Sequence, residues 1–245
     1  MLKKNQRLIR RSHRFLGIFI GIQFLFWTIS GLFFSWSDID EVHGDHMRKV
    51  PKALAFHYDL ASPSLVLDNL RKTVKADSIN AIRLISVVGE PVYQVAYFSG
   101  HAGDVHPHAH YVLANARTGK LRDPLSRDEA LALARDHVAS GATLKTVRLL
   151  ERTGAEHEYR DRPLPAWAVS FENPDCTVYI SAEQGTFQAI RNDHWRAFDF
   201  LWMFHTMDFE SRDDINNWVL RGFSILGLVT VLSGFLLFFA SWKRN

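Results

Sequence analysis

The chain has 245 residues, 47% of them hydrophobic, and a formal net charge of +3. A single cysteine, Cys176, excludes an intrachain disulfide and any cysteine-based zinc or iron–sulfur site within one chain. The sequence contains no G-x-S-x-G, no H-E-x-x-H and no phosphate-binding glycine loop, so the common hydrolase and nucleotide-binding signatures are absent.

Two long apolar stretches lie near the two ends of the chain. Residues 15–36 carry no charged side chain, and a helix of that length is about 33 Å long, enough to cross a hydrocarbon layer of about 30 Å. A second stretch covers residues 222–240. The first run is too long for a usual signal peptide, and no A-x-A-like cleavage site follows it, so we expect an uncleaved anchor. The sequence therefore predicts two transmembrane helices.

Basic residues flank both stretches on the side of the chain termini. The tail of residues 1–14 holds six Lys/Arg and no acidic residue, and Lys243 and Arg244 follow the second stretch. Short segments rich in Lys/Arg stay in the cytoplasm, which predicts an inner-membrane protein with both termini cytoplasmic and a periplasmic central domain. This placement accounts for the basic charge, so we expect the lipid bilayer as a partner and no binding to nucleic acid.

Small residues occur along both spans. Gly17 and Gly21 have the G-x-x-x-G spacing that lets two helix backbones approach closely, and the second span contains Gly222, Gly227 and Gly234. Two interpretations fit this pattern. The two spans pack on each other within one chain, or they contact a second copy, giving a homodimer, or another membrane subunit.

The region between the spans contains an internal repeat. Each copy begins with an expected helix, over residues 64–75 and 127–140, and the second has a capping box from Ser126 and Glu129, with Gly141 as its expected C-terminal cap. Strand-like runs follow, AIRLISVV in the first copy and LKTVRLLE in the second.

The clearest match between the copies lies further on. PVYQVAY at 91–97 parallels PAWAVSF at 165–171, with large apolar residues at alternate positions, as in a half-buried strand. Residues 111–119 then parallel residues 177–185, and each segment ends in a glycine turn. The first copy carries eight additional residues between these strands, within Ser99–His110, the most histidine-rich part of the chain.

This order of elements resembles the PepSY domain, present twice, although the second copy ends in S-A-E-Q-G rather than the D/N-A-x-T-G pattern. With R-R-x-H-R-x-x-G entering the first span and F-L-W-x-x-H preceding the second, nearly the whole chain resembles the PepSY-associated transmembrane family. That family includes larger proteins with four spans that are similar to haem-bearing ferric-siderophore reductases. This chain has half as many spans, which argues against a self-contained electron path across the membrane.

The resemblance implies an α+β fold in which two transmembrane helices bracket an extracytoplasmic tandem of helix-plus-antiparallel-sheet repeats. The expected boundaries are a basic tail at 1–14, a span at 15–36, a juxtamembrane segment at 37–59, repeats at 60–123 and 124–193, an interfacial amphipathic segment at 194–217, a span at 218–241 and a tail at 242–245.

Two histidines match family motifs in which the resemblance implies an axial haem ligand. His13 lies two residues before the first span. An interfacial residue among arginines is an equally good interpretation of His13. His205 shares an apolar helical face with five aromatic or aliphatic residues, where it is also interpreted as a structural residue. These five are Trp195, Phe198, Leu201, Trp202 and Phe209.

His43 and His46 lie just outside the first span and would face one side of a helix. Because both spans end near this surface, His43, His46 or His205 of a second chain is a candidate second ligand for a haem on His205. His13 is excluded from that site because it lies about 30 Å away, across the bilayer. The alternative is a solvated turn with no ligand.

A third group of histidines occupies HAGDVHPHAH. Its imidazoles, His101, His106, His108 and His110, are suitable ligands for zinc, copper or nickel. Gly103 and Pro107 favour a loop without fixed geometry, so the alternative is a polar hairpin loop.

The function expected from the resemblance is haem binding or electron transfer, accessory to the reduction of iron or siderophore complexes outside the membrane. The alternative is a non-enzymatic periplasmic docking or regulatory module for a protease or a membrane partner, because PepSY domains also resemble segments of protease propeptides. Whether the protein is an enzyme stays open at this point.

Overall fold

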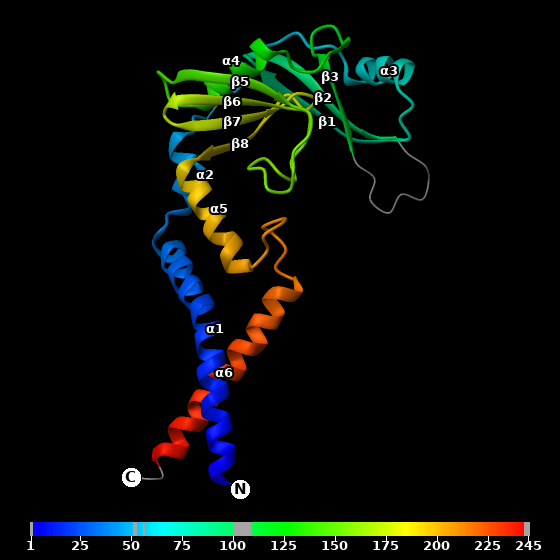
Figure 1. The fold of residues 1–245 in the computed structure, drawn as a ribbon. Helices are drawn as coiled ribbons and strands as arrows, with labels where there is room; N and C mark the ends of the chain where they lie inside the picture. Colours follow the sequence, from blue (N-terminus) through cyan, green and yellow to red (C-terminus); the bar gives the residue numbers. More distant parts are fainter. Residues whose placement is uncertain (1, 51–52, 56, 100–108, 243–245) are drawn as a thin grey trace. The chain divides into compact units, whose positions relative to one another are not determined.

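A computed structural model describes residues 2–50, 53–55, 57–99 and 109–242 (Figure 1). The chain divides into two compact units: residues 1–39 together with 194–245, and residues 40–193. The expected α+β fold is confirmed, because two long apolar helices bracket two antiparallel four-stranded sheets in the chain.

The first unit is built from three helices: α1 (Leu2–Trp36), most of α5 (Asp193–Thr206) and α6 (Trp218–Trp242). Within α1, residues 9–36 are long and apolar enough to cross a membrane, and so is the whole of α6. Helix α1 begins 13 residues before the apolar stretch predicted from the sequence. Lys and Arg are good helix formers, so the basic tail continues the helix.

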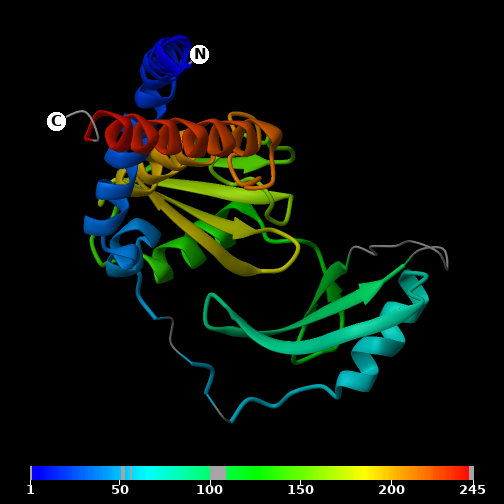
Figure 2. The ribbon, with the colours of Figure 1, turned by 90° about the horizontal axis from the view of Figure 1, so that it is seen from below.

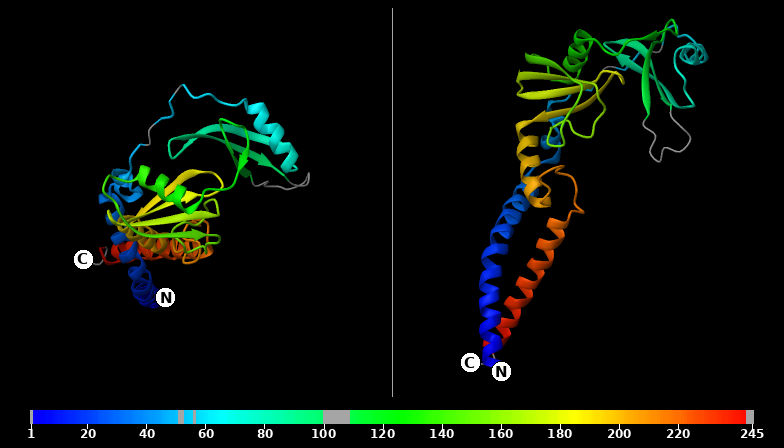
Figure 3. Two further views of the ribbon diagram at one scale, coloured as in Figure 1. Left: turned by 90° about the horizontal axis from the view of Figure 1, so that it is seen from above. Right: turned by 45° about the vertical axis from the view of Figure 1, so that its right-hand side comes forward.

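Helices α1 and α6 lie side by side in this unit (Figure 3). Glycines of α6 form the contact. A Cβ added at Gly227 would lie 3.0 Å from Cζ of Phe24, and one added at Gly234 would lie 3.3 Å from Cε1 of His13. A Cβ at Gly17 or Gly21 meets no described atom within 4 Å. The intrachain contact therefore uses the small residues of α6 and not the G-x-x-x-G of α1.

The second unit begins with a sheet of strand order β1-β2-β3-β4. Its strands are β1 (Ser78–Val87), β2 (Glu90–Phe98), β3 (His110–Asn115) and β4 (Leu121–Arg122). Helix α3 (Pro63–Thr73) begins after the N-cap Ser62 and lies along this sheet (Figure 2). Its Val66 and Leu70 are buried with Tyr93 and Val95 of β2, because residues four apart on a helix share one face.

The second sheet has the order β5-β6-β7-β8. Its strands are β5 (Thr143–Leu150), β6 (Ala166–Asn173), β7 (Cys176–Ser181) and β8 (Thr186–Asn192). Helix α4 (Arg127–His137) buries Ala130 and Leu133 against Val169 and Val178. Val92 and Leu113 of the first sheet belong to the same hydrophobic cluster, so the two sheets share a core.

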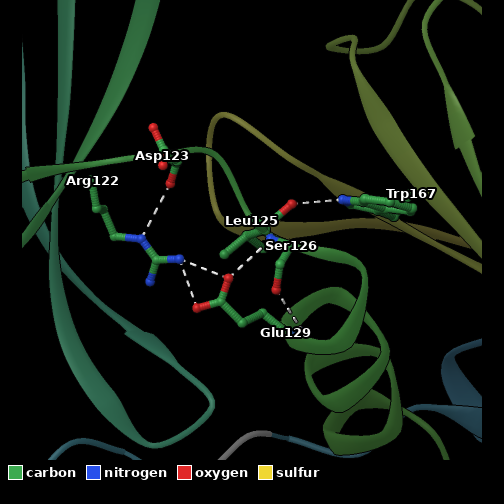
Figure 4. A network of polar contacts seen from close by, with 6 residues as sticks. All are labelled: Arg122, Asp123, Leu125, Ser126, Glu129 and Trp167. Carbon is green, nitrogen blue, oxygen red and sulfur yellow. Dashed lines mark hydrogen bonds and ion pairs between the residues drawn. The ribbon is translucent and has the colours of Figure 1, made fainter.

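A polar network joins β4 to the start of α4 (Figure 4). Arg122 donates from Nη2 to both carboxylate oxygens of Glu129, at 2.6 and 2.7 Å. Glu129 and Ser126 form the predicted capping box, which is confirmed. Trp167 of β6 donates from Nε1 to the carbonyl of Leu125 at 2.8 Å. The connection between the two sheets is thus held on both sides by hydrogen bonds.

Two expected details of the helix ends are wrong. Helix α4 ends at His137 and not at Ser140, because Val138 is extended and forms a β-bridge with Arg48, so Gly141 is not the cap. Helix α5 ends at Thr206, which leaves Phe209 outside it.

His43 and His46, which would face one side of a continuous helix, lie in two separate elements. Helix α2 (Ile39–His43) stops where Gly44 takes φ of +77°, and a separate 3-10 turn, η1 (Asp45–Met47), follows.

Candidate functional site

His205, near the C-terminal end of α5, packs against α1 in the first unit. Trp27 donates from Nε1 to the carbonyl of His205 at 2.9 Å, and Gln23 donates from Nε2 to the carbonyl of Phe204 at 3.2 Å. The last carbonyls of a helix lack intrahelical donors, so these two side chains satisfy groups that the helix cannot satisfy itself. The end of α5 is thereby fixed on α1.

The imidazole of His205 forms one hydrogen bond, between Nδ1 and the hydroxyl of Ser30, at 2.9 Å. The hydroxyl of Ser30 also lies within hydrogen-bond distance of two backbone carbonyls, that of Phe26 at 2.8 Å and that of Trp27 at 3.1 Å. In the tautomer with the imidazole proton on Nδ1, the serine oxygen accepts from the imidazole while its own proton goes to the backbone, and Nε2 keeps a lone pair. Nε2 makes no hydrogen bond among the described residues.

Aromatic rings surround this imidazole. The ring of Trp202 is stacked with it at a centroid distance of 6.2 Å, Trp27 is tilted at 6.2 Å and Phe34 approaches edge-on at 5.5 Å. A half-buried, neutral imidazole in an apolar environment is the type of ligand that haem iron takes.

His13 has the same arrangement at the other end of the helix pair. Its Nδ1 lies 2.7 Å from the hydroxyl of Ser233 on α6, and that hydroxyl donates to the carbonyl of Thr230 at 2.7 Å. In the corresponding tautomer of His13 the imidazole proton is on Nδ1, and Nε2 keeps a lone pair. His13 is half-buried.

The two imidazoles cannot serve one iron within a single chain. Ser30, the partner of His205, follows His13 by 17 residues on the same helix, which corresponds to about 26 Å. A single chain therefore brings only one of these two imidazoles to any one iron. Among the described residues, no group of three or more His, Cys, Asp or Glu could hold a metal ion.

Acidic residues order the connection between α5 and α6. Asp208 accepts hydrogen bonds from the backbone N–H groups of Glu210, Ser211 and Asp214 and from the hydroxyl of Ser211. Burial alone would raise the pKa of Asp208, but these hydrogen bonds outweigh it and lower the pKa to about 2.

Asp199 of α5 pairs with Arg212 of this connection at 2.5 Å, and its carboxylate is only 5% exposed. The connection is therefore a fixed element that holds the helix carrying His205.

The remaining predicted ligands lie in the second unit. His43 ends α2, His46 lies in η1, and both are exposed. His110 is exposed at the start of β3, where its ring stacks on Tyr97 at 5.5 Å. His101, His106 and His108 lie outside the described residues, so a metal site at this loop stays a prediction.

Sequence reasoning missed Ser30 and Ser233 as histidine partners. As small residues within apolar spans they indicate close helix packing, but they do not indicate a hydrogen bond to a particular residue. The presence of a serine within an apolar span is itself a signal of this role. A hydroxyl there has few possible hydrogen-bond partners besides its own backbone and a polar side chain on a facing helix. The sequence does not show which histidine each serine contacts, because the partners are 175 residues apart for Ser30 and His205 and 220 residues apart for Ser233 and His13.

Comparison with known families gave one match. The model of the family described as PepSY-associated TM region matches residues 2–244. No curated protein and no solved structure gave a significant match.

Proposed function

The chain belongs to the family described as PepSY-associated TM region and is a membrane protein, and on this premise we propose that it binds haem and takes part in electron transfer. His205 and His13 are the proposed axial ligands. The proposed role is accessory to the reduction of iron or siderophore complexes outside the membrane.

One observation carries the proposal: each of the two helix-interface histidines forms a hydrogen bond between Nδ1 and a serine hydroxyl that also reaches a backbone carbonyl. In the proposed tautomer the proton is on Nδ1, so this bond orients the ring and leaves Nε2 as the ligand atom. The arrangement occurs once on α1–α5 and once on α1–α6. Surface histidines such as His43 and His46 have no comparable fixed orientation.

The residues of the chain have distinct roles in this proposal. Ser30 and Ser233 orient the imidazoles, while Trp27, Phe34 and Trp202 exclude water around His205. A bound haem would supply one-electron chemistry. A second copy of the chain or another membrane subunit would supply the second axial ligand.

The orientation in the membrane is part of the proposal. The basic residues at the start of α1, before its apolar stretch, favour cytoplasmic termini and a periplasmic second unit in the inner membrane. His13 would then lie near the cytoplasmic face, while His205 would lie toward the periplasmic face.

The absorbance spectrum of the purified full chain tests the proposal. After expression with an adequate haem supply, we expect a Soret band that His205→Ala weakens or shifts. His57→Ala is the matched control, because His57 is exposed and belongs to the other unit. A protein without a Soret band would contradict the proposal.

A docking or regulatory function is the second candidate, and exposed edge strands favour it. β1 and β5 are edges of their sheets, and Ile79, Leu84 and Leu149 on them are 41–43% exposed. Edge strands with apolar side chains are sites for the addition of a partner strand. Co-purification of a stoichiometric partner without any chromophore would favour this function over haem binding.

A further inference from the structure

An apolar groove of about 430 Å³ lies along the C-terminal half of α6. It is lined by Val231, Gly234, Phe235, Phe238 and Phe239, which recur at the spacing of one helical face. The four larger side chains are 45–59% exposed. A concave apolar surface on a membrane-spanning helix is suited to a hydrocarbon chain.

Arginines of α1 lie at the level of this groove. The imidazole of His13 forms a hydrogen bond with the hydroxyl of Ser233, and a Cβ added at Gly234 would lie 3.3 Å from its Cε1. The turn of α1 around His13 therefore lies beside the groove. Arg10 precedes His13 by three residues, Arg14 follows it by one, and both are exposed. No acidic residue occurs in residues 1–14 to neutralise them.

We propose that the groove binds one acyl chain of an anionic phospholipid whose phosphate lies against Arg10 and Arg14. The guanidinium group is well suited to phosphate oxygens, and its long side chain reaches the headgroup layer from a position near the apolar core. Basic pockets beside transmembrane helices on the cytoplasmic side attract anionic headgroups for the same reason. The positive charge of Arg10 and Arg14 thus favours an anionic headgroup, while the apolar groove accommodates the acyl chain.

The helical geometry supplies a matched control. At about 100° per residue, Arg10 lies about 60° from His13 around the helix, whereas Arg11 lies about 160° away, on the opposite side. Arg10→Gln and Arg11→Gln remove the same charge from adjacent positions. A general attraction of the basic tail to anionic membranes would respond equally to both substitutions, and a localised phosphate site would not.

Trp242 provides a local reporter of the groove. Its ring lies 5.4 Å from that of Phe238, which lines the groove, and the side chain is exposed. We would place the full chain in nanodiscs containing either brominated phosphatidylglycerol or brominated phosphatidylcholine at matched fractions. Fluorescence quenching of the wild type minus that of Trp242→Phe isolates the signal from Trp242. A haem on His13 would compete for the space beside Gly234, so the experiment uses protein without added haem.

The expected result is stronger quenching of Trp242 by brominated phosphatidylglycerol than by the zwitterionic lipid. Arg10→Gln should weaken the apparent affinity for phosphatidylglycerol about fivefold, while Arg11→Gln should leave it close to that of the wild type. Val231→Phe, which fills the groove, should reduce quenching by both lipids. Equal quenching by the two lipids, or equal losses in Arg10→Gln and Arg11→Gln, would overturn the proposal. Because the protein carries no added haem in this experiment, neither outcome decides whether the chain binds haem.

Discussion

Ser30 and His205, separated by 175 residues in the sequence, are joined by a hydrogen bond of 2.9 Å between the serine hydroxyl and Nδ1 of the imidazole. The same hydroxyl lies 2.8 Å from the carbonyl of Phe26, so it can donate to the backbone while it accepts from Nδ1. The proposed haem function depends on the tautomer in which Nδ1 carries the proton and Nε2 is the ligand atom.

Ser30→Ala should weaken haem binding without removing the ligand itself. Loss of a side chain that orients a metal-binding histidine costs about 10–100-fold in metal affinity, because the ring then samples other orientations and the other tautomer. Haem titration of the full chain, followed by absorbance, measures the change. Ser30→Thr retains the hydroxyl and should restore most of the affinity. Equal affinities for Ser30→Ala and the wild type would show that Ser30 does not position His205.

The Arg122–Glu129 pair should contribute measurably to the stability of the second unit. Burial alone would raise the pKa of Glu129, but hydrogen bonds from Arg122 and Ser126 lower it below its ordinary value. Glu129→Ala removes the ion pair and half of the capping box, so we expect a loss of about 2 kcal/mol in the free energy of unfolding. Arg122→Ala removes only the partly exposed ion pair and should cost about 1 kcal/mol.

Urea unfolding of the full chain in detergent measures both losses. The double variant should show non-additive effects, because the two residues contact each other directly. Strictly additive losses would mean that the two side chains act independently, contrary to the bidentate geometry.

His137 should make the second unit sensitive to acid. Its side chain is buried beside Phe187, and burial, with a further effect of the charge of Arg48, lowers the pKa of His137 from 6.5 to about 4, although Asp136 acts in the opposite direction. Between these two pH values the unfolded chain binds a proton that the folded chain does not. The free energy of unfolding therefore falls as the pH decreases through this window, by about 3 kcal/mol at about 1.4 kcal/mol for each pH unit.

Unfolding measurements at pH 7 and pH 4.5 test the contribution of His137. His137→Gln should flatten the dependence by removing this contribution, whereas the exposed-site variant His57→Ala should leave it as in the wild type. An unchanged dependence in His137→Gln would assign the acid sensitivity to other groups.

Gly44 should tolerate no side chain. Its φ is +77°, and an added Cβ would lie 2.8 Å from Cγ2 of Ile190, so both backbone strain and a steric clash oppose substitution. We expect Gly44→Ala to lower the free energy of unfolding by about 2–3 kcal/mol. Gly141 is the matched control, because its φ is +89° but no described atom lies within 4 Å of an added Cβ. Gly141→Ala should therefore cost only about 1 kcal/mol, and equal losses would exclude the clash with Ile190.

The sequence was sufficient for elements that local patterns determine. Apolar length predicted both spans, and alternation predicted β2 and β6 to within two residues at each end. The capping box of Ser126 and Glu129 likewise predicted where α4 begins. In each case the decisive interactions lie within one helical turn or one strand.

Contacts between distant segments could not be derived in this way. Helix α4 ends early because Val138 pairs with Arg48, a residue 90 positions before it, and no local rule contains that pairing. The bonds of His13 and His205 to serines depend equally on how α1 meets α6 and α5. Periodicity identifies which face of a helix is apolar, but it does not specify the partner of a polar group on that face.

The amount of haem bound per chain tests the central claim most directly. It would be measured by absorbance for the wild type, His205→Ala, His13→Ala and the double variant, each purified as the full chain after expression with adequate haem. Because the two imidazoles are about 26 Å apart, we expect each single variant to lose part of the haem and the double variant to lose all of it. A wild type without a Soret band, or a double variant that retains its full haem content, would contradict the account.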